Sequence, residues 1–241
     1  MDRTKTGIDG LDEIVGGGYP SGTTILISGA SGTGKTIFCA QFLYKGIRDY
    51  DENGIYVTLE ARPEDLRTEM QSLGWDLKAY EDQERLVILD AASSCSSMTT
   101  KEKFSMPRSF DVDGLIAEIY KIVQKIHAKR LVLDSLPSLG LHITDTNQIR
   151  GIIYTLSSLL LEIGVTSLLT TESVHPDMIS RYGVEEFVCR SLIMLDLEER
   201  GNDLKRVLRV RKMRGTHHTM RTLPFEVKQD GIIIYAKGKK Y

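Results

Sequence analysis

Cysteine is scarce in this sequence, with three residues, Cys39, Cys95 and Cys189, far apart along the chain. Their odd number excludes a complete disulfide framework, and no pair has the short spacing of a zinc site. We therefore expect three reduced thiols, as in a cytoplasmic protein, and assign them no function.

Long apolar runs are also missing. No stretch approaches the roughly 20 residues of a membrane-spanning helix. Residues 2–5 are polar and lead into a glycine-rich stretch, so we expect no secretory signal peptide. The net charge of −2 creates no strong field that would favour nucleic acid or a membrane.

The sequence of 241 residues shows no internal repeat and no linker, so we expect a single domain over residues 1–241. Apolar strand patterns alternate with amphipathic helix patterns, which predicts an α/β fold with a mostly parallel sheet flanked by helices. The predicted parallel strands are 23–28, 54–59, 86–90, 130–135 and 165–172. Two antiparallel hairpins are predicted at the C-terminal end, pairing 192–196 with 207–211 and 225–227 with 232–235.

Residues Gly29 to Thr36 fit the phosphate-loop pattern G-x-x-x-x-G-K-[ST] without a mismatch. The loop follows a predicted strand and opens a predicted helix, the arrangement that binds phosphate through backbone N–H groups. Lys35 supplies a point charge for the β- and γ-phosphates, and the Thr36 hydroxyl can ligate Mg²⁺. We therefore predict that the chain is a P-loop NTPase.

Two carboxylates follow predicted strands. Asp134 ends an apolar strand downstream of the loop, which is the Walker B arrangement that holds Mg²⁺ through water. Glu60 stands where a general base for an attacking water is needed, but a solvated carboxylate at a strand end fits its position equally well. The polar residues 170–172 could sense the γ-phosphate or simply cap their strand. Residues 91–112 are predicted to form a mobile polar insertion, either a disordered surface loop or a loop that binds a partner or gates the site.

Residues 205–221 contain seven Lys or Arg and no acidic residue. Such a stripe could bind nucleic acid through phosphates. Period-2 geometry also places Lys212 and Arg214 on one face of a strand, where they could reach a nucleotide held by a neighbouring subunit, as an arginine finger does. A charged edge strand that discourages aggregation is a third interpretation. The residues alone leave all three open.

Several longer strings resemble a single KaiC-type domain of the RecA-like ATPases. The resemblance spans roughly residues 4–236. The strings that carry it are Thr6-Gly-Ile-Asp-Gly-Leu-Asp12, Val57-Thr-Leu-Glu60, Ser72-Leu-Gly-Trp-Asp76, Arg181-Tyr-Gly-Val-Glu-Glu-Phe-Val188 and Lys212-Met-Arg-Gly-Thr-His-His218.

The resemblance implies ATP held between adjacent subunits of a homo-oligomeric ring, expected to be a hexamer. It implies three groups of binding residues in addition to Mg²⁺ at Thr36 and Asp134. The phosphate group is Gly32, Thr33, Gly34, Lys35, Thr36 and Ile37. Ser72 and Leu73 match the adenosine side. The group expected to cross the interface is Lys212, Met213, Arg214, Thr216 and His218, with Gln229 and Asp230 near it.

The sequence departs from the family at one catalytic position, because Ala61 replaces the second of two glutamates. Glu60 would then be the only carboxylate that serves as the base. Lys35 and Arg214 are the other two expected catalytic residues. We expect a slow Mg²⁺-dependent ATPase coupled to regulation or assembly, and the resemblance gives no basis for predicting autokinase activity. A DNA-binding recombinase-type paralogue and a nucleotide-sensing switch that does not hydrolyse ATP are the alternatives. Protein partners and their identity do not follow from the sequence.

Overall fold

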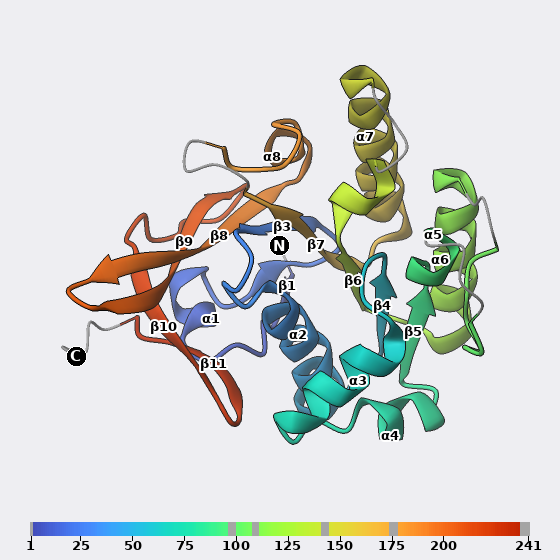
Figure 1. Cartoon of the computed structure of the whole chain (residues 1–241), viewed down its shortest axis with the longest axis horizontal. Helices are drawn as coiled ribbons and strands as arrows, with labels where there is room; N and C mark the ends of the chain where they lie inside the picture. The colour runs from blue at the N-terminus through green and yellow to red at the C-terminus, as the bar shows by residue number, and fades with distance from the viewer. Residues whose placement is uncertain (1, 96–99, 108–110, 141–144, 174–177, 237–241) are drawn as a thin grey trace.

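A nine-stranded sheet forms the centre of the protein (Figure 1). The computed structural model describes residues 2–95, 100–107, 111–140, 145–173 and 178–236. Across the sheet the strands run in the order β11-β10-β9-β8-β3-β7-β6-β4-β5. The bounds of these strands are β3 (Thr24–Gly29), β4 (Gly54–Thr58), β5 (Leu86–Asp90), β6 (Arg130–Asp134), β7 (Thr166–Glu172), β8 (Ser191–Arg200), β9 (Asp203–Met213), β10 (Leu223–Lys228) and β11 (Gly231–Ile234). A separate small sheet pairs β1 (Arg3–Thr4) with β2 (Tyr19–Pro20).

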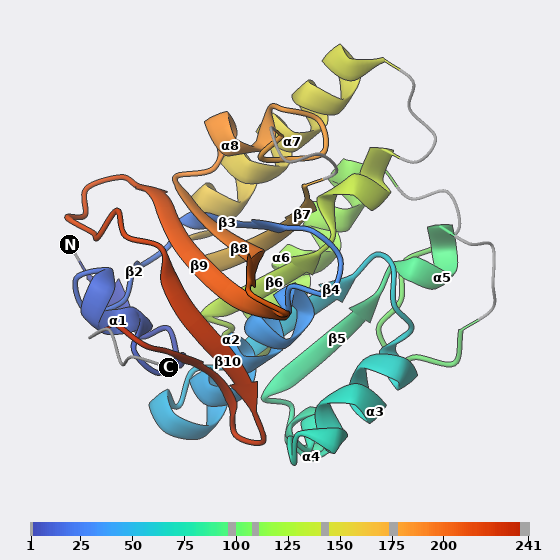
Figure 2. The same cartoon turned by 60° about the vertical axis from the view of Figure 1, so that its left-hand side comes forward.

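The strands from β3 to β8 pair in parallel, and β9, β10 and β11 continue the sheet antiparallel. The predicted α/β fold, with its parallel sheet and C-terminal hairpins, is thereby confirmed. β8 and β9 extend well beyond the predicted runs 192–196 and 207–211, and their charged ends pair across the ladder, as Glu198 does with Lys205. Figure 2 shows these C-terminal strands at one end of the sheet and β5, α3 and α4 at the other.

Helices cover both faces of the sheet because successive strand residues point to opposite sides. Tyr56 and Val132 face the core beneath α2, α3 and α4, whereas Val57 and Leu133 face the core beneath α6 and α7. The bounds of the helices are α1 (Leu11–Ile14), α2 (Lys35–Tyr50), α3 (Pro63–Ser72), α4 (Leu77–Asp82), α5 (Ala92–Cys95), α6 (Val112–Ile126), the 3₁₀ helix η1 (Leu136–Gly140), α7 (Thr146–Ile163) and α8 (Glu185–Val188). Among the described residues, no helix is long and apolar enough to cross a membrane.

The polar stretch 91–112 is only partly covered, because residues 96–99 and 108–110 lie outside the described residues. Its described parts include the short helix α5 and a bridge between Ser105 and Asp90 at the end of β5. The mobility predicted for this insertion stays a prediction, but its described parts contain regular structure that the prediction did not include. The reason is that Asp90 N donates to Phe104 O and Met106 N donates to Asp90 O, which adds the segment to the sheet edge.

The parallel strands place their carboxyl ends at one edge of the sheet. Gly29 at the end of β3 is in register with Glu172 at the end of β7, and Thr58 at the end of β4 is in register with Asp134 at the end of β6. Ligands of open parallel sheets bind outside this edge. The phosphate-loop sequence and both candidate carboxylates therefore meet at the same edge.

Candidate functional site

The loop before α2 leaves the N-terminus of this helix open to a ligand. Gly34 is the residue before the helix and has a φ of 103°, and no side chain caps the first turn. The helices α6 and α7, in contrast, are capped by the carboxylates of Asp111 and Asp145. The first N–H groups of α2 are thus available for an anion, which the helix dipole also favours.

Gly29 and Lys35 shape the loop from within. A Cβ atom on Gly29 would lie 2.3 Å from the carbonyl oxygen of Leu195, so this position accepts no side chain. Lys35 Nζ donates hydrogen bonds to Gly29 O at 2.8 Å and to Ala30 O at 3.1 Å. The ammonium group therefore lies against the loop, where it would face a bound phosphate.

Three hydroxyl groups surround the carboxylate of Asp134. Thr36 Oγ1 donates to Asp134 Oδ2 at 3.1 Å, Tyr56 Oη donates to the same oxygen at 2.7 Å, and Thr170 Oγ1 donates to Oδ1 at 2.5 Å. The two candidate magnesium ligands predicted from the sequence, Thr36 and Asp134, are thus in direct contact. Hydroxyl and carboxylate oxygens are ligands that Mg²⁺ prefers, so this pair fits that ion.

Burial affects the titratable neighbours of this carboxylate. Burial, followed by the nearby Asp134 carboxylate, raises the pKa of Tyr56 well above its usual range, so the phenol keeps its proton and remains a donor. The same two causes raise the pKa of the Cys39 thiol, which is completely buried within α2. Cys39 is therefore an inert core residue beside the site.

Glu60 lies in the exposed turn between β4 and α3, two residues beyond the end of β4. Its Oε1 atom accepts a hydrogen bond of 2.8 Å from Ser138 Oγ and also contacts Ser135 Oγ. Both serines follow Asp134, so they tie Glu60 to the segment that carries the candidate magnesium ligand. This arrangement places a carboxylate beside the segment that follows Asp134, while its role as a base stays a prediction.

The two threonines at the polar end of β7 contact two different carboxylates. Thr170 faces Asp134, but Thr171 Oγ1 donates to Glu185 Oε1 at 3.0 Å. Glu185 is fully buried and also accepts a hydrogen bond of 2.7 Å from Ser180 Oγ. Glu172 lies 3.8 Å from the guanidinium of Arg181. Only Thr170 among these residues is directed at the candidate magnesium ligands.

Ser72 and Leu73 end helix α3, and the structure brings the β10–β11 turn toward them. Trp75 packs so closely on Gly231 that a Cβ there would lie 2.8 Å from the indole. Gln229 and Asp230 form the exposed turn immediately before Gly231. The candidate residues Ser72 and Leu73 therefore lie in the same region of the chain's structure as Gln229 and Asp230.

The phosphate loop borders the same region. A Cβ on Gly34 would meet the side chain of Val227, in β10, at 3.9 Å. The expectation that Gln229 and Asp230 lie near the 212–218 segment is wrong within one chain. β10 runs antiparallel to β9, so its end lies beside the loop, whereas β9 ends at the opposite edge of the sheet.

The 212–218 segment begins with the last two residues of β9, at the edge of the sheet where β3 and β8 begin. Met213 pairs with Ser191, and Arg214 N donates to Arg190 O at 3.2 Å. Arg214 is exposed, whereas Met213 is buried in the core. Lys212 Nζ donates to the carbonyl oxygens of Glu186 at 2.9 Å and Cys189 at 2.7 Å.

The remaining members of that segment are held locally. Burial lowers the pKa of Lys212, with the positive charge of Arg214 as the next cause. Thr216 Oγ1 accepts a hydrogen bond of 2.8 Å from Arg3, and His218 Nδ1 lies 3.1 Å from Thr219 O. Within one chain, none of the five residues expected to cross the interface adjoins the phosphate loop.

Arg206 is a residue near the loop that the sequence did not single out. It is exposed on β9, and its Nη2 atom donates to Gly32 O at 3.3 Å. Nothing in the sequence distinguished Arg206 from the other six cations of residues 205–221 as the one that contacts the loop. Tyr56, Thr170, Ser135 and Ser138 were likewise missed as neighbours of the candidate carboxylates.

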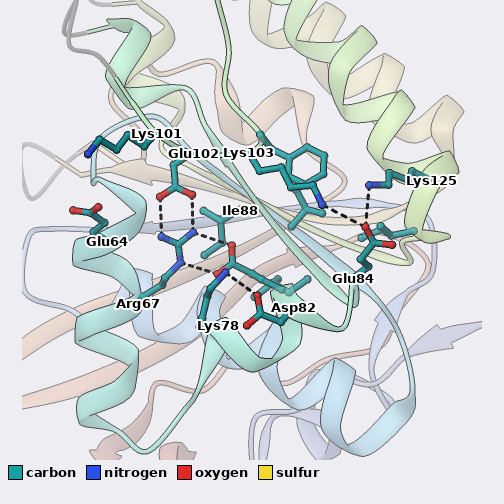
Figure 3. A pocket seen from close by; sticks show the side chains of 15 residues that line it. Glu64, Arg67, Lys78, Asp82, Glu84, Ile88, Lys101, Glu102, Lys103 and Lys125 are labelled. Carbon is teal, nitrogen blue, oxygen red and sulfur yellow. Dashed lines mark hydrogen bonds and ion pairs between the residues drawn. The ribbon is translucent and has the colours of Figure 1, made fainter.

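A charged groove of about 540 Å³ lies elsewhere, along β5 between α3, α4 and α6 (Figure 3). Arg67 forms paired hydrogen bonds with both Glu81 and Glu102 on its wall. Lys103 and Lys125 both approach the carboxylate of Glu84. These charges satisfy one another, and we interpret the groove as a network that fastens the 100–105 segment to α3 and α4.

A phosphate-loop sequence at the carboxyl edge of a parallel sheet, continued by antiparallel strands, defines the class of RecA-like P-loop proteins. Comparison with known proteins narrows this class. The family described as "ATPase: KaiC" matches residues 4–239, and the chain belongs to this family of ATPases.

The chain is similar to proteins from archaea and cyanobacteria. The crystal structure of the KaiC-like protein PH0186 from Pyrococcus horikoshii OT3 shares 46% sequence identity, with a TM-score of 0.85 and coverage of 97% of this chain and 99% of that one. The UPF0273 protein MJ1359 of Methanocaldococcus jannaschii is 39% identical over 237 residues, 98% of this chain and 97% of that protein.

The circadian clock oscillator protein KaiC of Prochlorococcus marinus subsp. pastoris is 39% identical over 239 residues. The match covers 99% of this chain and 46% of that protein, so the chain spans about half the length of this relative. The predicted resemblance to KaiC-type domains is confirmed over nearly the whole chain.

Proposed function

We propose that the chain binds MgATP at the 29–36 loop and hydrolyses it slowly. The observation that carries this proposal is the contact between Thr36 and Asp134 beneath an uncapped helix N-terminus. A nucleotide phosphate would bind the free N–H groups and Lys35. Mg²⁺ would be held by the Thr36 hydroxyl and, through water, by Asp134. Glu60 is the base we assign to the attacking water.

The second part of the proposal is a homo-oligomeric ring, a hexamer, in which each site is completed by Lys212 to His218 of a neighbour. Arg206 contacts the loop, and Arg214 comes eight residues later, directly after the last residue of the extended strand β9. At about 3.4 Å per residue these positions are about 27 Å apart, beyond the reach of one arginine side chain. Arg214 can therefore assist a phosphate loop only if that loop belongs to another copy.

The nucleic-acid alternative receives less support from the structure. Arg209 of the basic stripe pairs with Asp196 at 2.5 Å, Arg206 contacts the loop, and Lys212 is turned toward backbone carbonyls. Much of the stripe is thus engaged within the chain rather than presented as a continuous surface. We retain DNA binding as an outcome that the experiment can reveal.

Native mass spectrometry with and without MgATP, run beside a phosphate-release assay, tests the proposal. The wild type should form a ring and release phosphate, and Lys35→Ala should lose nucleotide binding. Lys121→Ala, on the exposed face of α6, is the matched control. A wild-type protein that binds no ATP contradicts the proposal, and a steeply salt-dependent stimulation by single-stranded DNA favours the recombinase-type alternative.

A further inference from the structure

The contacts of Tyr56 go beyond those needed for core packing. Tyr56 is a middle residue of β4, buried against α2, and its ring belongs to the core on that face of the sheet. Its hydroxyl nevertheless donates a hydrogen bond of 2.7 Å to Oδ2 of Asp134. Thr36 donates to the same oxygen. Tyr56 pairs with Val132 in the ladder, two residues before Asp134, so it reaches the carboxylate diagonally across the sheet.

Thr170 approaches the same carboxylate from the other side. It lies on β7, one residue beyond the pair Leu133–Leu169, and donates to Oδ1 at 2.5 Å. The Asp134 carboxylate is thus held from β4 by a phenol and from β7 by a hydroxyl. An ionised carboxylate offers about four acceptor directions on its two oxygens. Tyr56, Thr36 and Thr170 occupy three of them.

We propose that Tyr56 is a positioning residue for the magnesium site, which it serves by fixing the orientation of the Asp134 carboxylate. This inference rests on the proposed function, because it concerns the ion that would accompany ATP. With three directions taken by hydroxyl donors, one acceptor direction of the carboxylate remains for a water bound to the metal. The phenol restricts rotation of the carboxylate, and Thr170 acts in the same way from β7.

A purely structural role would have a different consequence. A tyrosine that only packs in the core would affect folding stability and would leave the metal dependence of nucleotide binding unchanged. Tyr19 provides this comparison within the same protein. It is completely buried in the same core cluster, and its hydroxyl has no hydrogen-bond partner among the described residues.

The test is isothermal titration calorimetry, which measures the affinity of the full chain for ATP, once in MgCl₂ and once in EDTA. It compares the wild type with Tyr56→Phe and Tyr19→Phe. Tyr56→Phe should weaken ATP binding in MgCl₂ by about tenfold or more, as expected for loss of an outer-shell partner, while binding in EDTA stays unchanged. Tyr19→Phe should match the wild type in both buffers. Thr170→Val, which removes the donor on β7, should shift binding in the same direction as Tyr56→Phe.

The results separate this inference from the proposed function. If Tyr56→Phe binds ATP as the wild type does in both buffers, or weakens equally in both, Tyr56 has no specific role at the metal and the inference is overturned. A wild-type protein that binds no ATP, or binds it equally well in MgCl₂ and EDTA, instead refutes the proposed magnesium site itself. The inference then falls with it.

Discussion

Arg206 lies in β9 and Arg214 directly follows this strand, and the two residues lie at opposite edges of the sheet. The guanidinium of Arg206 donates to Gly32 O of its own phosphate loop, whereas Arg214 N, just past the end of the strand, donates to Arg190 O where β3 and β8 begin. The two arginines therefore cannot serve the same nucleotide from one chain. This separation makes contact between neighbouring copies the central point of the proposed mechanism.

Glu60→Gln tests the assigned base. The substitution keeps the size of the side chain and an oxygen that can accept from Ser138, but removes the negative charge that takes up a proton. We expect phosphate release to fall about 100-fold or more, with ATP binding unchanged. Glu64→Gln, in the exposed first turn of α3, is the control.

The same measurement distinguishes an ATPase from a nucleotide-sensing switch. If Glu60→Gln releases phosphate as fast as the wild type, Glu60 is not the base. If the wild type binds ATP tightly and releases no phosphate at all, the switch is the better description. The replacement of a second glutamate by Ala61 makes this comparison informative.

Gly46→Ala tests the packing between α2 and β6. Arg130 is fully buried, pairs with Glu52 at 2.5 Å and lies over the Phe42 ring at 4.5 Å. A Cβ on Gly46 would lie 2.3 Å from Arg130 Nε, so the substitution should cost about 1–3 kcal/mol of unfolding free energy despite the better helix propensity of alanine.

Gly151→Ala in α7 is the matched control, because a Cβ there meets nothing within 4 Å. It should raise stability by up to about 1 kcal/mol through helix propensity alone. Urea unfolding of both variants measures the difference. A Gly46→Ala protein as stable as the wild type would show that Arg130 can move aside at little cost.

The buried cysteines should resist thiol reagents in the native protein. Cys39 and Cys189 are fully buried, and burial raises the pKa of Cys189 to about 12. At pH 8, well below this pKa, only about one in 10⁴ such thiols is ionised and reactive. In a Cys95→Ser background, Ellman's reagent should react with no thiol before unfolding and with two afterwards. Rapid native release of one equivalent would contradict the buried placement.

The sequence predicts the strands well because buried parallel strands are short apolar runs between clear turn signals. All five predicted parallel strands are present, with ends that differ by one residue at most. The order of strands across the sheet was not predictable, because it depends on which crossovers pack best in three dimensions. Short elements such as α4, α5 and α8 also escaped prediction, since a helix of four to six residues has too little periodicity to recognise.

The candidate site was predictable only where a local motif exists. Residues 29–36 form a contiguous pattern, and Asp134 follows a recognisable strand. Tyr56 carried no signal, because a tyrosine in an apolar strand is an ordinary core residue until the neighbouring strand places a carboxylate 2.7 Å from its hydroxyl. The misplacement of Gln229 and Asp230 has the same origin, since antiparallel pairing returns them to the loop edge while the preceding segment stays at the other.

The most direct test of the central claim mixes two inactive variants. Lys35→Ala lacks a working loop, and Arg214→Ala lacks the group offered to a neighbour. In a randomly mixed ring with head-to-tail contacts, about a quarter of the sites combine an intact loop with an intact Arg214, so phosphate release should recover to about a quarter of the wild-type rate. Lys35→Ala mixed with Glu60→Gln, whose defects share one chain's site, should recover nothing. No recovery in the Lys35→Ala and Arg214→Ala mixture would contradict a site completed by a second copy.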